Sequence, residues 1–156
     1  MKIVMVCLGN ICRSPLADGL MRKKVIENKL DIIVDSAGTT GIHAGKSPDP
    51  RMCQTAKNFD TPIDSLKARK FTVEDFDNFD IIFVMDKSNK ANVLQMAKNE
   101  EDKKKVHLIL EMSHPGQNLE VPDPYYGGEE GFIEVYHLLD IATDCILEKI
   151  KNNELN

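Results

Sequence analysis

A cysteine and an arginine near the start of the chain have the types and the spacing to attack and bind a phosphate group. Cys7 ends an apolar run, Gly9 and Asn10 follow it, and Arg13 comes six residues after the cysteine. A thiolate is a strong nucleophile, and a guanidinium can bind two phosphoryl oxygens at once. Gly and Asn accept sharp backbone turns, which lets several amide N–H groups surround one anion. We therefore predict that residues 7–14, called the phosphate loop below, cradle a phosphate with a nucleophile at its base.

The same loop would favour the ionised form of the thiol. Ser14 is a good helix cap and Pro15 suits the first helical position, so a helix is expected to begin here. Its N-terminus, the loop amides and the Arg13 guanidinium would all stabilise a thiolate at Cys7. Most cysteines at the end of an apolar strand are small buried hydrophobic residues. The arginine and the helix start favour a nucleophile instead.

A candidate proton donor lies far along the chain, at Asp123 between Pro122 and Pro124. Expelling a phenolate, whose conjugate acid has a pKa of about 10, calls for a donor near the leaving oxygen. The two prolines would restrict where the carboxyl group points, although an Asp-Pro pair more often simply forms a turn. Tyr125 and Tyr126 follow and could stack against an aromatic ring, but one of them could equally pack near the last helix.

Five blocks of sequence, in order along the chain, resemble the low-molecular-weight protein tyrosine phosphatases. They are residues 7–15 (CLGNICRSP), 35–39 (DSAGT), 47–51 (SPDPR), 84–89 (VMDKSN) and 122–127 (PDPYYG). Cys-x5-Arg-Ser alone is moderately specific, but together with a distant Asp-Pro-Tyr-Tyr it is a strong signature. The resemblance implies hydrolysis of phosphotyrosine in proteins, and of small aryl phosphates, through a phosphocysteine intermediate. It implies no metal and no other cofactor.

The resemblance also implies a role for each residue of the site. Cys7 would attack phosphorus, Arg13 would bind the transferred phosphoryl group, and Asp123 would act first as acid and then as base. Phosphate or another oxyanion would be held by the residues Leu8, Gly9, Asn10, Ile11, Cys12 and Ser14. The substrate ring would be flanked by Ile42, Tyr125 and Tyr126, although the family often has an aromatic residue at the position of Ile42.

Two further residues near these have supporting roles by the same resemblance. Asp86 is expected to support the phosphate loop rather than take part in the chemistry. Cys12 lies five residues after Cys7 and could form a disulfide with it under oxidation. From the spacing alone, a packed second thiol is an equal alternative.

Other functions are weighed against this one. Arsenate reductases use a similar loop but need a further pair of cysteines, which is absent where it is expected, near residues 80–98. Arginine phosphatases usually have Thr where this chain has Ile11, which favours tyrosyl phosphate. A non-enzymatic phosphotyrosine-binding module would lack Cys7 or Asp123. Residues 40–47 approach a nucleotide-binding loop, but Thr40 replaces its first glycine.

The elements expected to position these residues are alternating strands and helices. Strands are expected over residues 2–7, 31–36, 80–85 and 106–110, and helices over 15–28, 48–58, 87–98 and 129–151. This pattern predicts an α/β fold, a single domain over residues 1–156 with a doubly wound four-stranded parallel sheet and helices on both faces. Ligands of such sheets bind beyond the carboxyl ends of the strands, where Cys7 lies.

Composition limits the partners and the compartment. The 156 residues include 20 basic and 25 acidic side chains, a net charge of −5, which argues against a nucleic-acid partner. No apolar run is long enough to cross a membrane, and the N-terminus does not resemble a signal peptide. The 4 cysteines have neither metal-ligand nor disulfide-framework spacing, which favours a reducing cytoplasm. Nothing in the sequence demands more than a monomer.

Overall fold

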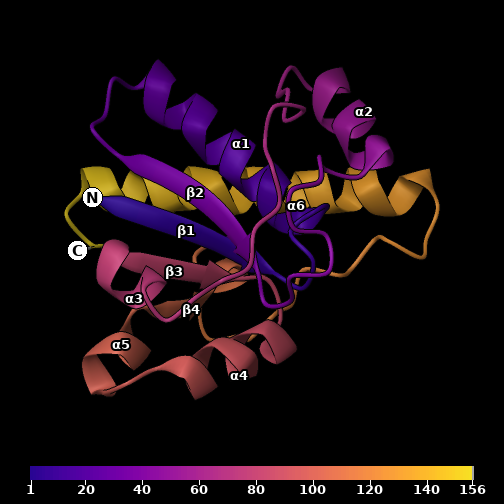
Figure 1. The fold of residues 1–156 in the computed structure, drawn as a ribbon. Coiled ribbons are helices and arrows are strands. Elements are labelled where there is room, and N and C mark those ends of the chain that lie inside the picture. Colours follow the sequence, from indigo (N-terminus) through magenta and orange to yellow (C-terminus); the bar gives the residue numbers. More distant parts are fainter. Residues whose placement is uncertain (156) are drawn as a thin grey trace.

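A four-stranded parallel sheet forms the centre of the computed structural model, which describes residues 1–155 (Figure 1). Its strands are β1 (Lys2–Cys7), β2 (Ile33–Gly38), β3 (Ile81–Val84) and β4 (Val106–Leu108), in the order β2-β1-β3-β4. Each neighbouring pair is parallel. The order reverses between β1 and β3, as in doubly wound sheets, so a crevice is expected beyond the end of β1. The predicted α/β fold is confirmed.

Helices cover both faces of the sheet (Figure 1). One face carries α1 (Arg13–Glu27), α2 (Pro50–Asn58) and α6 (Glu129–Lys151). The other carries α3 (Asp75–Asn78), α4 (Lys87–Met96) and α5 (Glu100–Lys104), and a 3-10 turn, η1 (Ile109–Glu111), follows β4. In the described residues, none of these helices combines the length and apolar character needed to span a membrane.

The sheet separates two apolar cores because side chains alternate along β1. Ile3 and Met5 pack toward α1 and α6, whereas Val4 and Val6 pack toward α3 and α4. The long helix α6 has the predicted bounds and buries residues at spacings of three and four: Phe132, Val135, Tyr136, Leu139, Ala142 and Ile146. Burial on both faces explains why β3, and all of β1 after the exposed Lys2, are apolar.

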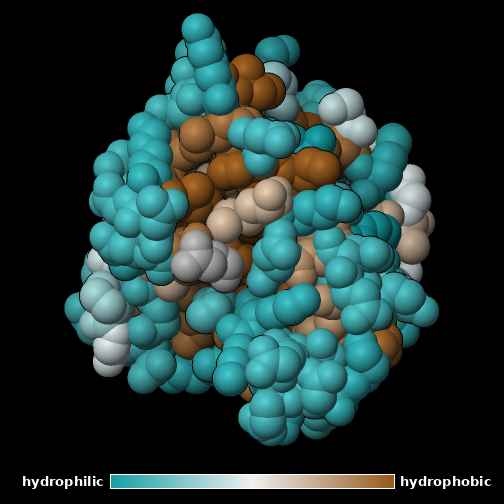
Figure 2. Space-filling view, turned by 90° about the vertical axis from the view of Figure 1, so that its left-hand side faces the viewer, coloured by the Kyte–Doolittle hydropathy of each residue, from teal (hydrophilic) through white to brown (hydrophobic). Residues whose placement is uncertain are grey.

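The two ends of the strands lie on opposite sides of the molecule (Figure 1). Figure 2 shows the end where the strands begin, with apolar side chains among hydrophilic ones. Met1 and Ile33, at the amino ends of β1 and β2, are exposed there. The carboxyl ends of the strands lie on the opposite side of the molecule, where the phosphate loop follows β1 (Figure 1).

Two helix starts differ from the prediction, and at one of them the side chain of another residue provides the cap. The first helix begins at Arg13, so Ser14 is not its cap, and Cys12 in the cap position makes no side-chain capping bond. The second begins at Pro50 rather than residue 48, because the carboxylate of Asp49 accepts a hydrogen bond from the Arg51 N–H at 2.8 Å. In both cases the predicted Ser-Pro start lies within two residues of the observed one.

Other boundaries also shift. The second strand lies at 33–38 rather than 31–36, so that Gly38 pairs with Cys7 at the end of the sheet. The third strand spans 81–84 rather than 80–85, and the following helix ends at Met96 rather than at residue 98. The fourth strand stops at Leu108, where the chain turns into η1. The helices α3 and α5 were not predicted, since 4 and 5 residues are too few to show a helical period.

Candidate active site

The loop after β1 closes around the sulfur atom of Cys7. The Ser14 hydroxyl lies 3.0 Å from this sulfur, and the backbone N–H of Asn10 donates to it at 3.3 Å. Asn10 adopts a left-handed conformation, with φ at 56°, which turns its N–H inward. The Asn10 N–H is a donor to the sulfur, and the Ser14 hydroxyl lies close enough to be a second one.

The loop is held from the neighbouring strand β2. Gly38 at the end of this strand comes so close that a Cβ atom there would lie 2.9 Å from the carbonyl oxygen of Leu8. The N–H groups of Thr39 and Thr40 donate to the carbonyl oxygens of Cys7 and Leu8, at 2.9 and 3.0 Å. A glycine is therefore required at position 38 for the two segments to pack.

Arg13 lies at the start of α1 with its guanidinium buried. Its Nη1 donates to Asp86 Oδ2 at 2.7 Å and to the carbonyl oxygen of Val121 at 3.1 Å. Burial by itself would lower the pKa of the Arg13 guanidinium, but the negative charges of Cys7 and the Asp86 pair outweigh it and raise this pKa. Asp86, which caps α4 just after β3, thus supports Arg13, as the family resemblance implies.

Asp123 lies across from the phosphate loop. Its Oδ2 is 3.6 Å from Arg13 Nη2, and its Oδ1 accepts a hydrogen bond from the Tyr125 N–H at 3.1 Å. A carboxyl group more than a hundred positions away in sequence is thereby brought to the same end of the sheet as Cys7. The two candidates for chemistry meet in one place.

A pocket of about 290 Å³ joins these residues. Among the predicted site residues, it is lined by Cys7, Leu8, Gly9, Ile11, Cys12, Arg13, Ile42, Asp123, Tyr125 and Tyr126. Asn10 and Ser14 are predicted site residues that do not line it, because their side chains are buried behind the sulfur. A nucleophile, a cation, a partly exposed acid and a rim of aromatic and aliphatic side chains therefore share one opening.

The chain matches one protein family along nearly its whole length. The sequence pattern of the family described as "Low molecular weight phosphotyrosine protein phosphatase" matches residues 2–155. The chain belongs to this family.

Individual relatives agree with this assignment. A low molecular weight phosphotyrosine protein phosphatase of Schizosaccharomyces pombe is 43% identical over 150 residues, covering 93% of this chain and 94% of the relative. A protein tyrosine phosphatase crystal structure from Entamoeba histolytica, with Hepes in its active site, superposes with a TM-score of 0.93 at 39% identity and covers 99% of each chain. A Drosophila arginine phosphatase structure has a TM-score of 0.90 at 30% identity, covering 97% of this chain and 98% of its own.

Two residues of the phosphatase pocket were not singled out from the sequence. Thr40 and His43 line it beside Ile42. The ring of His43 packs on the phosphate loop, since a Cβ atom at Gly9 would lie 3.0 Å from His43 Cδ2. The signal available in the sequence was the position of both residues in the segment that follows β2, next to a predicted substrate-binding residue.

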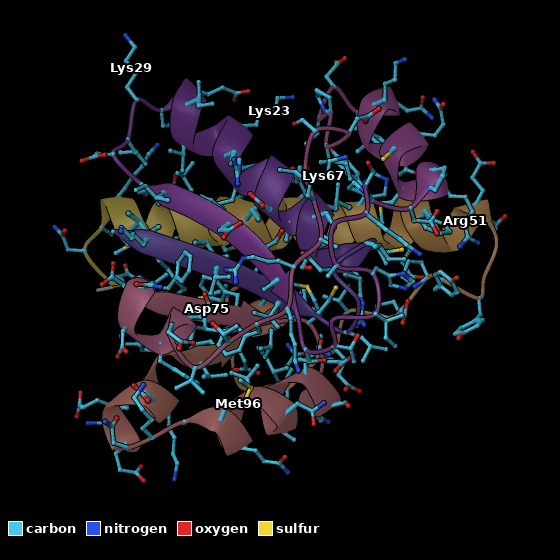
Figure 3. All side chains as sticks on the ribbon, viewed as in Figure 1. Lys23, Lys29, Arg51, Lys67, Asp75 and Met96 are labelled. Atoms are coloured by element: carbon cyan, nitrogen blue, oxygen red, sulfur yellow. The ribbon has the colours of Figure 1, made fainter. Side chains whose placement is uncertain are left out.

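Arg51 holds the segment that carries Asp123 in this phosphatase. Its Nη2 donates to the carbonyl oxygen of Tyr125 at 2.9 Å, and its guanidinium lies over the Phe132 ring at 4.7 Å from the centroid. Figure 3 shows Arg51 beside the chain that leads into α6. Asp49 binds the same guanidinium at 2.9 Å. The residues 122–127, called the acid loop below, are thus tied to α2.

Cys12 is buried next to the nucleophile. Burial, followed by the charge of Asp49, raises the pKa of the Cys12 thiol well above its ordinary value, so that it stays protonated. Both Cys7 and Cys12 are free thiols in the structure. Cys12 therefore packs here as a second thiol, and its disulfide with Cys7 stays a prediction.

Proposed function

We propose that this family member hydrolyses phosphotyrosine in proteins, and small aryl phosphates, with Cys7 as nucleophile and Asp123 as acid and base. One observation supports it most: a sulfur atom with an N–H donor and a hydroxyl group against it lies in the same pocket as a buried guanidinium and a partly exposed carboxyl group. The other thiol that lines the pocket, Cys12, has a pKa raised by burial and is therefore the weaker nucleophile.

In the first step, the Cys7 sulfur attacks phosphorus while the bond between phosphorus and the phenolic oxygen breaks. Asp123 gives its proton to the departing oxygen, and tyrosine leaves. In the second step, the Asp123 carboxylate takes a proton from water as the water oxygen attacks phosphorus. The phosphorus–sulfur bond breaks, inorganic phosphate leaves, and the thiolate and the protonated acid are restored.

The phosphate loop would stabilise both transition states. The equatorial oxygens are held by the Arg13 fork and by backbone amides of residues 8–14, which are already oriented before substrate arrives. The Asp86 bond keeps the Arg13 guanidinium in place during both steps. Such preorganised donors commonly supply a large share of the rate enhancement.

The rim of the pocket suits an aromatic ring. Ile42 and Tyr126 are exposed there, Tyr125 is partly exposed, and the two tyrosine rings meet edge to face at 4.9 Å. An arginine phosphatase shares this fold, but Ile11 offers the pocket no hydrogen-bonding group for a phosphoguanidinium. We therefore place phosphotyrosine ahead of phosphoarginine. Cys53 and Cys145 do not line the described pocket, which also disfavours arsenate reduction.

The test uses the purified protein with reductant and EDTA, given a phosphotyrosine peptide and a phosphoarginine peptide at equal concentration. Phosphate release from the first at the higher kcat/KM, together with a phosphorylated Cys7 peptide after rapid acid quenching, is the expected result. Release that EDTA abolishes, a phosphoryl group trapped elsewhere, or a preference for phosphoarginine would contradict the proposal.

We place the enzyme in a reducing cytoplasm, where the Cys7 thiol stays available, and expect it to act as a monomer. The net charge of −5 favours neither a nucleic acid nor an anionic membrane surface as partner. Light scattering at concentrations used for the assay tests the monomer, because an active dimer would have twice the mass.

A further inference from the structure

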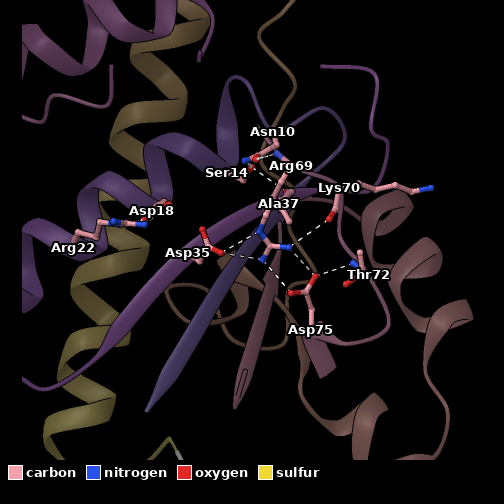
Figure 4. A network of polar contacts seen from close by, with 10 residues as sticks. All are labelled: Asn10, Ser14, Asp18, Arg22, Asp35, Ala37, Arg69, Lys70, Thr72 and Asp75. Carbon is pink, nitrogen blue, oxygen red and sulfur yellow. Dashed lines mark hydrogen bonds and ion pairs between the residues drawn. The ribbon is translucent and has the colours of Figure 1, made fainter. Parts of the chain in front are cut away.

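A second arginine, Arg69, lies at the centre of a cluster of charges below the phosphate loop (Figure 4). It belongs to the segment between α2 and α3, which runs beside the end of β2. Its Nη2 is 3.0 Å from Asp35 Oδ2 in β2, and its Nη1 and Nη2 bind both oxygens of Asp75 in α3, at 3.0 and 3.1 Å. Asp75 is buried and also accepts from the Thr72 N–H at 2.8 Å. Arg69 therefore ties its own segment to a strand on one side and a helix on the other.

The backbone of the same residue contacts the phosphate loop. The Arg69 N–H donates to Asn10 Oδ1 at 3.0 Å, and Asn10 Nδ2 donates to Ser14 Oγ at 2.7 Å. Ser14 Oγ in turn lies 3.0 Å from the sulfur of Cys7. Three consecutive hydrogen bonds thus connect the Arg69 backbone to the nucleophile.

The direction of these bonds follows from the first donor. A backbone N–H can only donate, so it requires the oxygen of the Asn10 amide to face Arg69 and the NH₂ group to face Ser14. Ser14 Oγ then accepts from Asn10, and its own hydrogen is left for another acceptor. The sulfur of an ionised Cys7, 3.0 Å away, can only accept a hydrogen bond, whereas the alternative acceptor, the Ala37 carbonyl oxygen, lies at 3.4 Å. The hydroxyl hydrogen is therefore directed at the sulfur, where it stabilises a thiolate.

We propose that Arg69 is a positioning residue for the reaction: its ion pairs with Asp35 and Asp75 hold its N–H where it orients Asn10, and through Ser14 stabilise the Cys7 thiolate. The inference rests on the proposed role of Cys7 as nucleophile. It assigns a function in catalysis to a charge cluster that lies outside the pocket.

The environment of Arg69 keeps its guanidinium charged, so that its ion pairs with Asp35 and Asp75 persist. Burial by itself would lower the pKa of its guanidinium, but the Asp75 hydrogen bond and the Asp35 charge outweigh burial and raise this pKa. The guanidinium therefore stays charged over the working pH range. Two backbone bonds, from Gly38 N–H to the Arg69 carbonyl oxygen at 2.8 Å and from Phe71 N–H to the Gly38 carbonyl oxygen at 2.7 Å, link the segment to the end of β2.

The experiment measures ionisation of the nucleophile without turnover. Folded wild type and Arg69→Met are alkylated with iodoacetamide across a pH series, and modification of Cys7 is followed by peptide mass mapping. The other charges around this thiol, on Arg13, Asp86 and Asp123, are unchanged by the substitution. We expect the midpoint of the alkylation profile to rise by about one pH unit, and kcat at pH 6 to fall about tenfold with little change in KM.

Matched variants distinguish an effect on the ionisation of Cys7 from a general loss of stability against unfolding. Arg22→Met is the control, because Arg22 also pairs with a buried carboxylate, Asp18, at 3.3 Å, but on the outer part of α1 (Figure 4). It should lower the urea midpoint of unfolding and leave the alkylation profile unchanged. Arg69→Lys, which keeps the charge, should restore most of the wild-type profile.

Asp35→Asn keeps the test decisive if Arg69→Met does not fold, because Asp35 is partly exposed and only one of the two ion pairs is lost. Its alkylation midpoint should rise by a smaller amount in the same direction. Wild-type profiles in both Arg69→Met and Asp35→Asn, or in Asp35→Asn alone if the former is unfolded, would overturn the inference. Failure of the proposed function gives a different result: wild type would alkylate readily at Cys7 and yet release no phosphate.

Discussion

The proposed nucleophile and the proposed acid are held in opposite ways. In the phosphate loop the residues Asn10, Arg13 and Ser14 are at most 2% exposed, and their polar groups bond to one another or to neighbouring segments. In the acid loop the Asp123 side chain is 38% exposed and Tyr126 is 92% exposed. One region is enclosed by the fold and the other lies on its surface.

The contacts of the acid loop with the rest of the molecule are correspondingly few. Just before it, the Val121 N–H donates to the Met85 carbonyl oxygen at 2.8 Å, and within it Tyr125 accepts from Arg51. The hydrogen bond of Asp123 to the Tyr125 N–H lies inside the loop itself. Segments with few buried contacts open at low free-energy cost.

The difference matches what each group must do. A thiolate needs donors in place before substrate arrives, because electrostatic stabilisation costs least when it is preorganised. An acid that protonates a leaving group must admit the substrate ring and let tyrosine depart, so an exposed position is suitable. We infer that the buried phosphate loop stabilises the negative charge of the thiolate. The exposed acid loop governs how the substrate ring enters the pocket and how tyrosine leaves it.

The largest effect is expected from Cys7→Ser, which tests the buried region. The serine hydroxyl stays protonated, so turnover of phosphotyrosine should fall by more than about 10⁴-fold. The donors of the phosphate loop remain, so calorimetry should still detect binding of inorganic phosphate. Loss of phosphate binding together with activity would show that the sulfur holds the loop in shape.

Asp123→Asn should have the next largest effect and tests the exposed region. Hydrolysis of phosphotyrosine should slow by about 10²–10⁴-fold, because tyrosine then leaves as an unprotonated phenolate. An aryl phosphate whose phenol is far more acidic needs no donor and should slow much less. A leaving-group series on both proteins measures this difference, and equal slowing for every ester would remove the acid role from Asp123.

The two regions also differ in how well they could be predicted from the sequence. The phosphate loop was predicted from spacing because Cys7, Gly9, Asn10 and Arg13 lie within one short segment, and the structure brings them together. Asp123 has no local pattern that distinguishes a catalytic acid from a turn, so its role depended on the family resemblance. The structure places both residues in the lining of one pocket.

Two residues that act through tertiary contacts, Arg51 and Arg69, were not predicted, whereas the support from Asp86 was expected from the family resemblance. Arg51 and Arg69 are ordinary surface arginines in the sequence, and only the fold places one on the acid loop and the other beneath Asn10. The helix starts at Arg13 and Pro50 were misplaced for a related reason. A cap depends on which side chain reaches the free N–H groups, and at the second helix the carboxylate of Asp49 does so.

Arg51→Met tests whether the acid loop can be made less ordered without changing the phosphate loop. The acid loop loses its hydrogen bond at the Tyr125 carbonyl oxygen, and the Phe132 ring in α6 loses the guanidinium that lies over it. We expect kcat for phosphotyrosine to fall by about three- to tenfold, since about 1 kcal/mol of orientation is lost. The rate for an ester with an acidic phenol, and the alkylation profile of Cys7, should not change.

Lys57→Met, on the exposed side of the same helix, is the matched control and should retain both rates. An equal loss for both esters in Arg51→Met would mean that Arg51 supports the phosphate loop as well. The separation between the two regions would then be wrong.

The smallest effect is expected from Asp49→Asn. It is measured as the pH dependence of stability against unfolding in urea. The Arg51 hydrogen bond holds the pKa of the Asp49 carboxyl below its ordinary value of 3.8. A carboxyl whose pKa is lower in the folded than in the unfolded state stabilises the fold above that ordinary value, and the contribution is lost as pH falls below it. Asparagine still caps the helix but does not titrate.

The urea midpoints of wild type and Asp49→Asn should therefore differ most between pH 5 and 7 and converge as pH falls from about 4 toward 3. The phosphotyrosine rate of this variant should lie between those of wild type and Arg51→Met, because Arg51 keeps its bond to Tyr125 but loses the carboxylate that orients it. A stability difference that stays constant across this pH range would show that the charge of Asp49 does not contribute to stability. The exposed loop would then depend on Arg51 without help from its ion pair.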